Sequence, residues 1–276
     1  MWPGDGTRPT ECLRIGRHAV ERWTSVDAIL ALSAEHALPQ SSPPNPQRIT
    51  EAIAALYAQA PDTPVALVLE SAWLPVMLVD TGRTLLPAAE VEALVRHRFG
   101  LMHSDGPDPV SAWELRIEHR VGSRHALAYG MAPRFKQMLI AAARVMGLRW
   151  SAMTPAFAWG LQRLRPAKSW PRSAGWFAWP EQDRTLVARI ESNQVVGFNA
   201  GAPRVADVSG LLALVDSEGT RLGIDSTSDP IGAATWRSAP STARVDERVT
   251  WLDVRGAGRV SVTSRLGLTQ TTRAPA

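Results

Sequence analysis

The pattern of apolar and polar positions is clearest in the stretch 64–155. Two apolar runs, at 65–69 and 74–79, are separated by only four residues, and this spacing predicts two strands joined as a hairpin. A second pair of strands is expected at 112–119 and 125–131, because the residues between them form a short turn-like segment with glycine and serine.

Two further segments repeat their apolar residues every three or four positions, which predicts helices. The first helix is expected at 87–99, and its inward face is formed by Val91, Leu94, Val95 and Phe99. The second ends before Gly147, a typical C-cap residue. Its inward face is formed by Phe135, Met138, Leu139, Ala142 and Met146. A strand at 148–153 then completes the order ββ-α-ββ-α-β.

The segment before this stretch predicts a hairpin from 12–16 and 19–23. The apolar run 25–33 fits either a helix or a buried strand, and the pattern does not decide between them. A helix then begins with Asn45 as its N-cap and Pro46 as its first residue. Its buried residues are expected to be Ile49, Ile53, Leu56 and Tyr57.

The segment after this stretch begins with a helix at 156–164 and continues with a strand pair over 185–198 that turns at 191–194. A helix within 205–215 follows, with Leu211, Leu212 and Val215 inward. Residues 225–247 are rich in Ser, Thr, Pro and Asp, which predicts a loop. The last two strands are expected at 249–254 and 260–264.

These elements divide the chain into two parts, as its length of 276 residues allows. Residues 1–10 are expected to form a disordered tail, and residues 11–165 the first part. A segment with two prolines then separates this part from the second, at 175–266. Residues 267–276 are expected to form a polar tail.

The composition of the chain favours a cytoplasmic location for the protein. Hydrophobic residues make up 45% and charged residues 20% of the chain, as in ordinary globular proteins. No apolar stretch approaches the ~20 residues that span a bilayer, and the first residues lack the apolar core of a signal peptide. Cys12 is the only cysteine, which excludes an intramolecular disulfide and a multi-cysteine metal site.

The net charge is +4, and Lys136 and Lys168 are the only lysines among the 30 basic residues, so 28 are arginines. The arginines are spread along the chain. This charge predicts weak attraction to anionic surfaces, such as a membrane face, and it favours no nucleic-acid partner because no basic stripe is present. Lys136 falls on the polar side of its helix and is expected at the surface.

Three patterns could carry chemistry. Asp80-Thr81-Gly82 follows a strand and resembles a phosphate-contacting Asp-x-Gly loop, but ordinary turn chemistry is the favoured interpretation. His103, Asp105 and Asp108 could hold a hard cation, although a solvated loop is favoured. The spacing of the histidines does not indicate zinc; they are residues 18, 36, 97, 103, 119 and 125. Neither a hydrolase elbow nor a P-loop motif occurs.

Trp176 and Trp179 flank the start of an apolar run and belong to the 11 tryptophans of the chain. They could be exposed for a partner, but a place in the core is the favoured interpretation.

Taken together, residues 12–200 resemble the actin-like scaffold proteins of type IV pilus and type II secretion machines, such as PilM and the cytoplasmic domain of GspL. The resemblance lies in the order of elements and in short sequence features at 65–69, 85–87, 90–99, 113–118, 125–131, 132–155 and 185–198. It implies an α/β fold of mixed sheets and flanking helices. The plan is actin-like (ribonuclease H-like) and two-lobed, with a first lobe at 11–165 that carries an inserted subdomain and a truncated second lobe at 175–266.

The chain departs from this family at the positions where actin-like ATPases bind nucleotide. Actin-like ATPases carry an Asp in the first hairpin, whereas the corresponding segment of this chain, Arg14-Ile15-Gly16-Arg17, contains no acid. They open the second half with Asp-x-Gly, but residues 179–184 contain no glycine. A loop without glycine cannot offer close backbone approach to phosphates. The fold is therefore expected to be degenerate, without catalytic, cofactor-binding or metal-binding residues, and bound ATP is not favoured.

The resemblance implies a non-catalytic cytoplasmic scaffold that is peripheral at the inner membrane. Its implied partners are the cytoplasmic segment of a bitopic membrane protein and other assembly components. The resemblance does not decide whether the chain forms homo-oligomers. The alternative is an active ATPase or kinase of the same superfamily. Such an enzyme needs an acid that holds Mg²⁺, and the acids considered for this role are Asp80, Asp183 and Asp253.

Overall fold

The computed structural model describes residues 11–26, 29–39, 45–59, 61, 63–82, 86–103, 108–120, 122–164, 174–236, 246–253, 260–263 and 269–271. The chain divides into two compact units, Met1–Ala156 and Phe157–Ala276. The division expected from the sequence lies later, after residue 165, and the helix at 156–164 falls almost entirely in the second unit. The tail expected at 1–10 lies outside the described residues.

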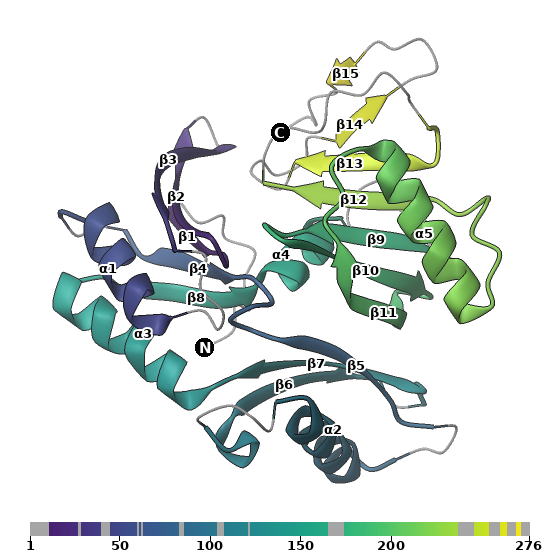
Figure 1. Cartoon of the computed structure of the whole chain (residues 1–276), viewed down its shortest axis with the longest axis horizontal. Coiled ribbons are helices and arrows are strands. Elements are labelled where there is room, and N and C mark those ends of the chain that lie inside the picture. The colour runs from purple at the N-terminus through teal and green to yellow at the C-terminus, as the bar shows by residue number, and fades with distance from the viewer. Residues whose placement is uncertain are drawn as a thin grey trace. The chain divides into compact units, whose positions relative to one another are not determined.

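The first unit is built on a five-stranded mixed sheet with the order β3-β2-β1-β4-β8 (Figure 1). Its strands are β1 (Glu11–Ile15), β2 (Ala19–Val26), β3 (Ile29–Ala37), β4 (Val65–Leu69) and β8 (Trp150–Pro155). The first three strands are antiparallel neighbours, and β4 runs parallel to both β1 and β8. The expected N-terminal hairpin is confirmed, and the ambiguous run at 25–33 is extended rather than helical.

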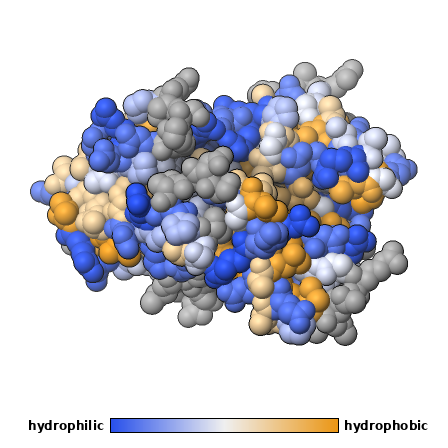
Figure 2. Space-filling view, turned by 60° about the horizontal axis from the view of Figure 1, so that its bottom comes forward, coloured by the Kyte–Doolittle hydropathy of each residue, from blue (hydrophilic) through white to orange (hydrophobic). Residues whose placement is uncertain are grey.

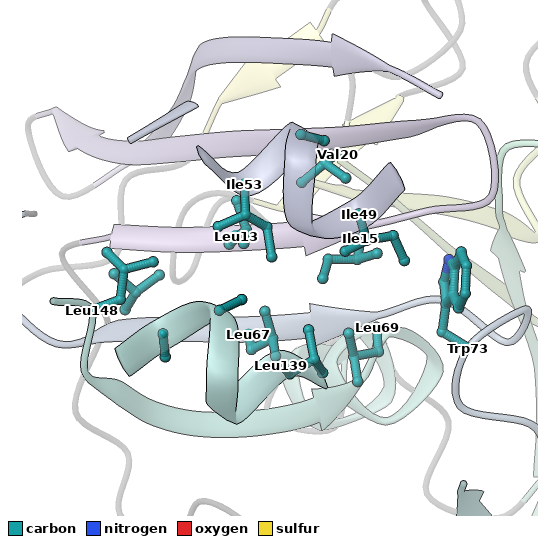
Figure 3. Packing of buried hydrophobic residues seen from close by; sticks show 14 of the residues in the cluster. Leu13, Ile15, Val20, Ile49, Ile53, Leu67, Leu69, Trp73, Leu139 and Leu148 are labelled. Atoms are coloured by element: carbon teal, nitrogen blue, oxygen red, sulfur yellow. The ribbon is translucent and has the colours of Figure 1, made fainter. Parts of the chain in front are cut away.

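Helices α1 (Pro46–Leu56) and α3 (Pro133–Met146) pack on one face of this sheet. The N-cap predicted for α1 and the C-cap predicted for α3 are both confirmed. The Asn45 side chain accepts a hydrogen bond from the Gln47 backbone N–H, and Gly147 ends α3 with a φ of 67°. Figure 3 shows the core between helices and sheet. Its buried residues include Leu13, Ile15, Ile49, Ile53, Leu67 and Leu139, so the inward faces predicted for both helices are confirmed.

A smaller module is inserted between β4 and α3. It contains β5 (Val76–Asp80), α2 (Ala88–His103), the short 3-10 helix η1 (Val110–Ala112), β6 (Glu114–His119) and β7 (His125–Met131). The strands form an antiparallel sheet with the order β5-β7-β6. Its own core includes Met77, Val91, Val95, Phe99, Trp113 and Ala128. The helix predicted at 87–99 and the strand pair predicted after it are confirmed.

The hairpin predicted from 65–69 and 74–79 is wrong. β4 pairs with β1 and β8, whereas β5 pairs with β7 in the other sheet. The reason is the turn after β4, where the backbone N–H groups of Trp73 and Leu74 both donate to the Glu70 carbonyl oxygen. This turn leads the chain into the inserted module instead of back along β4.

The second unit contains a seven-stranded mixed sheet with the order β11-β10-β9-β12-β13-β14-β15. Its strands are β9 (Ala174–Pro180), β10 (Arg184–Glu191), β11 (Gln194–Pro203), β12 (Ile231–Thr235), β13 (Val249–Asp253), β14 (Val260–Thr263) and β15 (Thr269–Thr271). The strand pairs predicted at 185–198 and at 249–264 are confirmed. The loop predicted at 225–247 is wrong for residues 231–235, which form the central strand β12. The polar tail expected at 267–276 contains the short strand β15.

Helices α4 (Ala156–Leu164) and α5 (Val208–Leu222) contact alternate residues of β9 and therefore opposite faces of this sheet. On the α5 side, Trp176 packs in a cluster with Leu211 and Val215. On the α4 side, Gly160 lies against Trp179. Both tryptophans are almost completely buried, so the structure places them in the core rather than at an exposed partner site.

The two units repeat one topology. In each, three antiparallel strands are followed by a helix and then by two parallel strands, and the orders β3-β2-β1-β4-β8 and β11-β10-β9-β12-β13 correspond position by position. The first unit differs by the inserted module and by α3 before β8, and the second by α4 before β9 and by two added strands. No helix among the described residues has both the length and the apolar character that a membrane span requires.

Candidate functional site

The most unusual polar cluster of the first unit lies at the carboxyl ends of β1 and β4. In open α/β sheets, ligands bind in the crevice outside the carboxyl ends of the parallel strands, so a ligand site is expected at this end. Arg14 lies on β1 directly opposite Glu21 of β2, and Glu70 follows the last residue of β4. All three side chains are at least 95% buried.

Arg14 joins the two carboxylates. Its Nη1 donates to Glu21 Oε2 at 2.9 Å, and its Nη2 donates to Glu70 Oε1. Trp23 adds a second donor to Glu21, since its Nε1 lies 3.0 Å from Oε2. Because burying charge is costly unless opposite charges and hydrogen bonds compensate it, these groups stabilise one another and hold one arrangement.

Backbone N–H groups at this end of the sheet also donate hydrogen bonds within the chain. The Gly16 N–H donates to the Ala19 carbonyl oxygen at 2.9 Å, and the Glu70 N–H donates to the Ile15 carbonyl oxygen at 3.0 Å. A phosphate site requires several backbone N–H groups that point at the ligand. Here the Gly16 N–H instead closes the turn that follows β1, and the Glu70 N–H joins the end of β4 to the end of β1.

The buried Trp73 side chain lies beside the first turn. Its indole Nε1 donates to the Gly16 carbonyl oxygen at 2.8 Å, and its ring stacks on Phe135 with centroids 5.0 Å apart. The indole thus connects the β1–β2 turn to α3. A bulky ring in this position stabilises the sheet end and leaves less room for a ligand next to Gly16.

The Asp80-Thr81-Gly82 pattern forms a turn, as the favoured interpretation predicted. Asp80 Oδ1 accepts a hydrogen bond from the Gly82 N–H at 2.8 Å, and Asp80 Oδ2 pairs with Arg124 Nη2 at 2.7 Å. The hydrogen bond from Arg124 and then that from Gly82 lower the pKa of Asp80 from 3.8 to about 2. This carboxylate is occupied in joining β5 to β7.

The proposed cation loop is not assembled among the described residues. The His103 ring stacks on Trp113 with centroids 5.2 Å apart, and its burial lowers its pKa. Asp108 instead pairs with Arg134 at 3.0 Å, while Asp105 lies outside the described residues. No group of three or more His, Cys, Asp or Glu residues in the described part of the chain could hold a metal ion.

The other acids considered for an enzyme are not gathered into one site. Asp183 pairs with the adjacent Arg184 at 3.0 Å, and the side chain of Asp253 is not among the described ones. Lys136, expected at the surface, is only half-exposed and forms an ion pair with Glu114 of β6. This pair joins α3 to the inserted module.

Glu21 and Glu70 were not predicted from the sequence as members of this cluster. A signal was present for Glu21, because a tight turn at residues 17–18 places it opposite Arg14 in the hairpin. Glu70 gave a weaker signal, as an acid directly after an apolar run. That it meets Arg14 depends on the parallel pairing of β1 with β4, which joins residues far apart in sequence.

No protein-family model and no curated protein matches the sequence, but solved structures are similar in fold. One is the cytoplasmic domain of EpsL, an inner membrane component of the type II secretion system of Vibrio cholerae. It is 15% identical, with 86% of each chain covered and a TM-score of 0.44.

Two further structures are similar. One is a Bacteroides thetaiotaomicron protein with an actin-like ATPase fold and unknown function, at 9% identity, 83% coverage of each chain and a TM-score of 0.49. The other is the PilM–PilN type IV pilus biogenesis complex, at 15% identity and a TM-score of 0.42, with 79% of this chain and 67% of that chain covered. At such identities the similarity concerns the fold alone. The mixed sheets and flanking helices confirm the mixed α/β class, and one of the similar structures has the actin-like ATPase fold.

Proposed function

We propose that this chain is a non-catalytic cytoplasmic scaffold of a pilus or secretion-type inner-membrane assembly, and that it binds the cytoplasmic segment of a bitopic membrane protein. The observation that carries the non-catalytic part is the buried cluster of Arg14, Glu21 and Glu70. It stands at the carboxyl ends of β1 and β4, where a phosphate-binding loop is expected.

Phosphoryl transfer depends on backbone N–H groups and a cation that meet the phosphates, together with carboxylates that hold Mg²⁺. At this strand end the guanidinium of Arg14 lies between the two carboxylates. Recruiting Glu21 or Glu70 for Mg²⁺ would first require that this ion cluster be broken. The arrangement therefore supports a structural role for these residues.

The pilus or secretion setting follows from the order of elements and the short motifs that residues 12–200 share with the scaffolds of those machines. A scaffold of this kind works by holding partners, and a short cytoplasmic tail can bind as an added strand or as an extended peptide. We expect peripheral attachment to the inner membrane through that partner.

The test is recovery of partners from detergent-solubilised membranes with the affinity-tagged full chain. We expect a bitopic component of a pilus or secretion assembly to be recovered, and its cytoplasmic segment alone to bind the purified chain. Recovery of no such component, against a tag-only control, would contradict the proposal. Tight Mg-ATP binding by the purified chain would instead favour the alternative, an ATPase or kinase.

A further inference from the structure

Helix α2 carries two exposed apolar side chains at its C-terminal end. Of the five large hydrophobic residues that are exposed among the described residues, Leu101 (63% exposed) and Met102 (66%) are the only adjacent pair. The helix lies on one face of the β5-β7-β6 sheet (Figure 1), where it buries Val91, Val95 and Phe99. Leu101 and Met102 lie outside this core, so the packing of the inserted module does not account for them.

Basic residues share this exposed face of the helix. His97 and Arg98 are both exposed, and each precedes one of the two apolar residues by four positions. Residues spaced by four are neighbours on a helix surface, so His97 lies beside Leu101 and Arg98 beside Met102. The segment 93–103 contains no acid. The C-terminal half of α2 therefore presents positive charge and apolar side chains together.

The described charges around this face are already paired with one another. Arg96 pairs with Glu92 at 2.9 Å, and its Nη1 donates to the Trp113 carbonyl oxygen at 3.2 Å. Asp108, the next described acid along the chain, is buried and pairs with Arg134 at 3.0 Å. Among the described residues, the charge that remains at this end of α2 is positive, and its complement is an anionic surface.

We infer that the C-terminal half of α2 binds an anionic lipid surface. Leu101 and Met102 enter the boundary between headgroups and acyl chains, and Arg98 remains among the anionic headgroups. This inference rests on the proposed function, which expects the chain at the inner membrane. It adds a direct lipid contact to the attachment through the membrane partner, and it assigns the weak attraction to anionic surfaces, expected from the net charge, to one helix.

The small size of the face favours lipid over a protein partner. The segment 93–103 is about 16 Å long as a helix, whereas stable protein–protein interfaces bury roughly 800 Å² per partner. On the face drawn in Figure 2, apolar residues lie in small groups among polar ones rather than in one large patch. A lipid surface requires no matching shape, and two apolar side chains beside an arginine suit weak and reversible binding to it.

The first experiment locates the contact with a fluorescent label. Cys12 is the only cysteine and is buried, so an added surface cysteine can be labelled selectively. Met102→Cys, carrying a polarity-sensitive dye, is mixed with vesicles of equal parts phosphatidylglycerol and phosphatidylcholine. We expect a blue shift of the emission that decreases as salt is added. The matched control is Val145→Cys on α3, a position that is 87% exposed, and it should show no shift.

Three results of this experiment would overturn the inference. They are no shift for Met102→Cys, an equal shift for Val145→Cys, and an equal shift with vesicles of phosphatidylcholine alone. Because the purified chain is used without its partner, the result does not depend on whether a membrane partner is recovered.

The second experiment measures co-sedimentation of unlabelled variants with the same vesicles. We expect Leu101→Gln combined with Met102→Gln to weaken binding about tenfold, and Arg98→Gln to weaken it several-fold. Arg144→Gln combined with Val145→Gln makes the same kinds of change at exposed positions of α3 and should have no effect. All of these variants should melt at the temperature of the wild type, because the substituted side chains are exposed.

Vesicle binding that is unchanged in both α2 variants would overturn the inference. If the double α2 variant lost the membrane partner in recovery from membranes but bound vesicles like the wild type, this face would bind protein instead of lipid. The scaffold proposal would then stand and the lipid contact would not.

Discussion

Gly160 of α4 lies so close to the indole of Trp179 on β9 that a Cβ at this glycine would be 2.3 Å from two ring carbons. Phe177 lies on the same side, 3.0 Å from that position. Both rings are completely buried, so neither can move aside without repacking the sheet. The helix can approach the sheet only because residue 160 has no side chain.

The first prediction is that Gly160→Ala lowers the free energy of unfolding by about 1–3 kcal/mol, the usual cost of overpacking a core. The matched control is Gly100→Ala in α2, where a Cβ would meet nothing within 4 Å. Because alanine favours helices, this control should raise stability by about 0.5–1 kcal/mol. Urea unfolding of both variants gives the comparison, and effects of the same sign would contradict the packing described.

The second prediction concerns α3. Leu139 is completely buried against α1 and the sheet, so Leu139→Ala should cost about 2–5 kcal/mol. Lys136→Ala removes only the partly exposed pair with Glu114 and should cost less than about 1 kcal/mol. Equal losses in urea unfolding would mean that the inward face of α3 is misassigned.

The sequence was sufficient for elements whose pattern is local. Asn45 and Gly147 mark the ends of helices, and the apolar spacing around Leu139 sets the buried face of α3. It was not sufficient for contacts across the sheets. Nothing near residue 70 shows that β4 pairs with β1 and that Glu70 therefore meets Arg14, and the hairpin predicted at 65–79 failed for the same reason. β12 was missed because Ser-, Thr- and Pro-rich flanks hide a five-residue strand that central pairing stabilises.

The third prediction tests the buried ion cluster. Arg14→Met leaves two buried carboxylates without their shared cation, and such a loss typically costs about 3–5 kcal/mol. Arg48→Met breaks an exposed pair with Glu51 and should cost less than about 1 kcal/mol. Adding Glu21→Gln and Glu70→Gln to Arg14→Met should restore part of the stability. If thermal unfolding shows the same loss of stability for Arg14→Met and Arg48→Met, the structural role of the cluster is refuted.

The fourth prediction concerns pH. Because the pKa of Asp80 is lowered in the folded chain to about 2, its ion pair stabilises the fold at pH values above its ordinary pKa of 3.8. This contribution is lost as the pH falls from about 4 to about 2. An NMR titration of the carboxyl group should give a pKa near 2 in the wild type and a value closer to 3.8 in Arg124→Gln. Arg120→Gln removes the same charge nearby and should leave the pKa of Asp80 almost unchanged.

The last prediction concerns nucleotide, because it separates a scaffold from an enzyme. At the carboxyl ends of β1 and β4, the N–H groups of Gly16 and Glu70 are already hydrogen-bonded within the chain, and Arg14 is held by two carboxylates. Millimolar Mg-ATP should therefore leave the melting temperature of the full chain unchanged within about 1 °C. A ligand at one hundred times its Kd adds about 2.7 kcal/mol, which corresponds to a shift of several degrees.

The matched control for this measurement is Glu70→Gln, which keeps the size of the side chain and removes its charge. If the wild type showed a Mg-dependent rise in melting temperature that Glu70→Gln abolished, Glu70 would hold the metal ion and the chain would be an enzyme candidate. If Mg-ATP shifts neither protein while Glu70→Gln alone lowers the melting temperature, Glu70 stabilises Arg14 and not a nucleotide. That second result is the one expected of a scaffold.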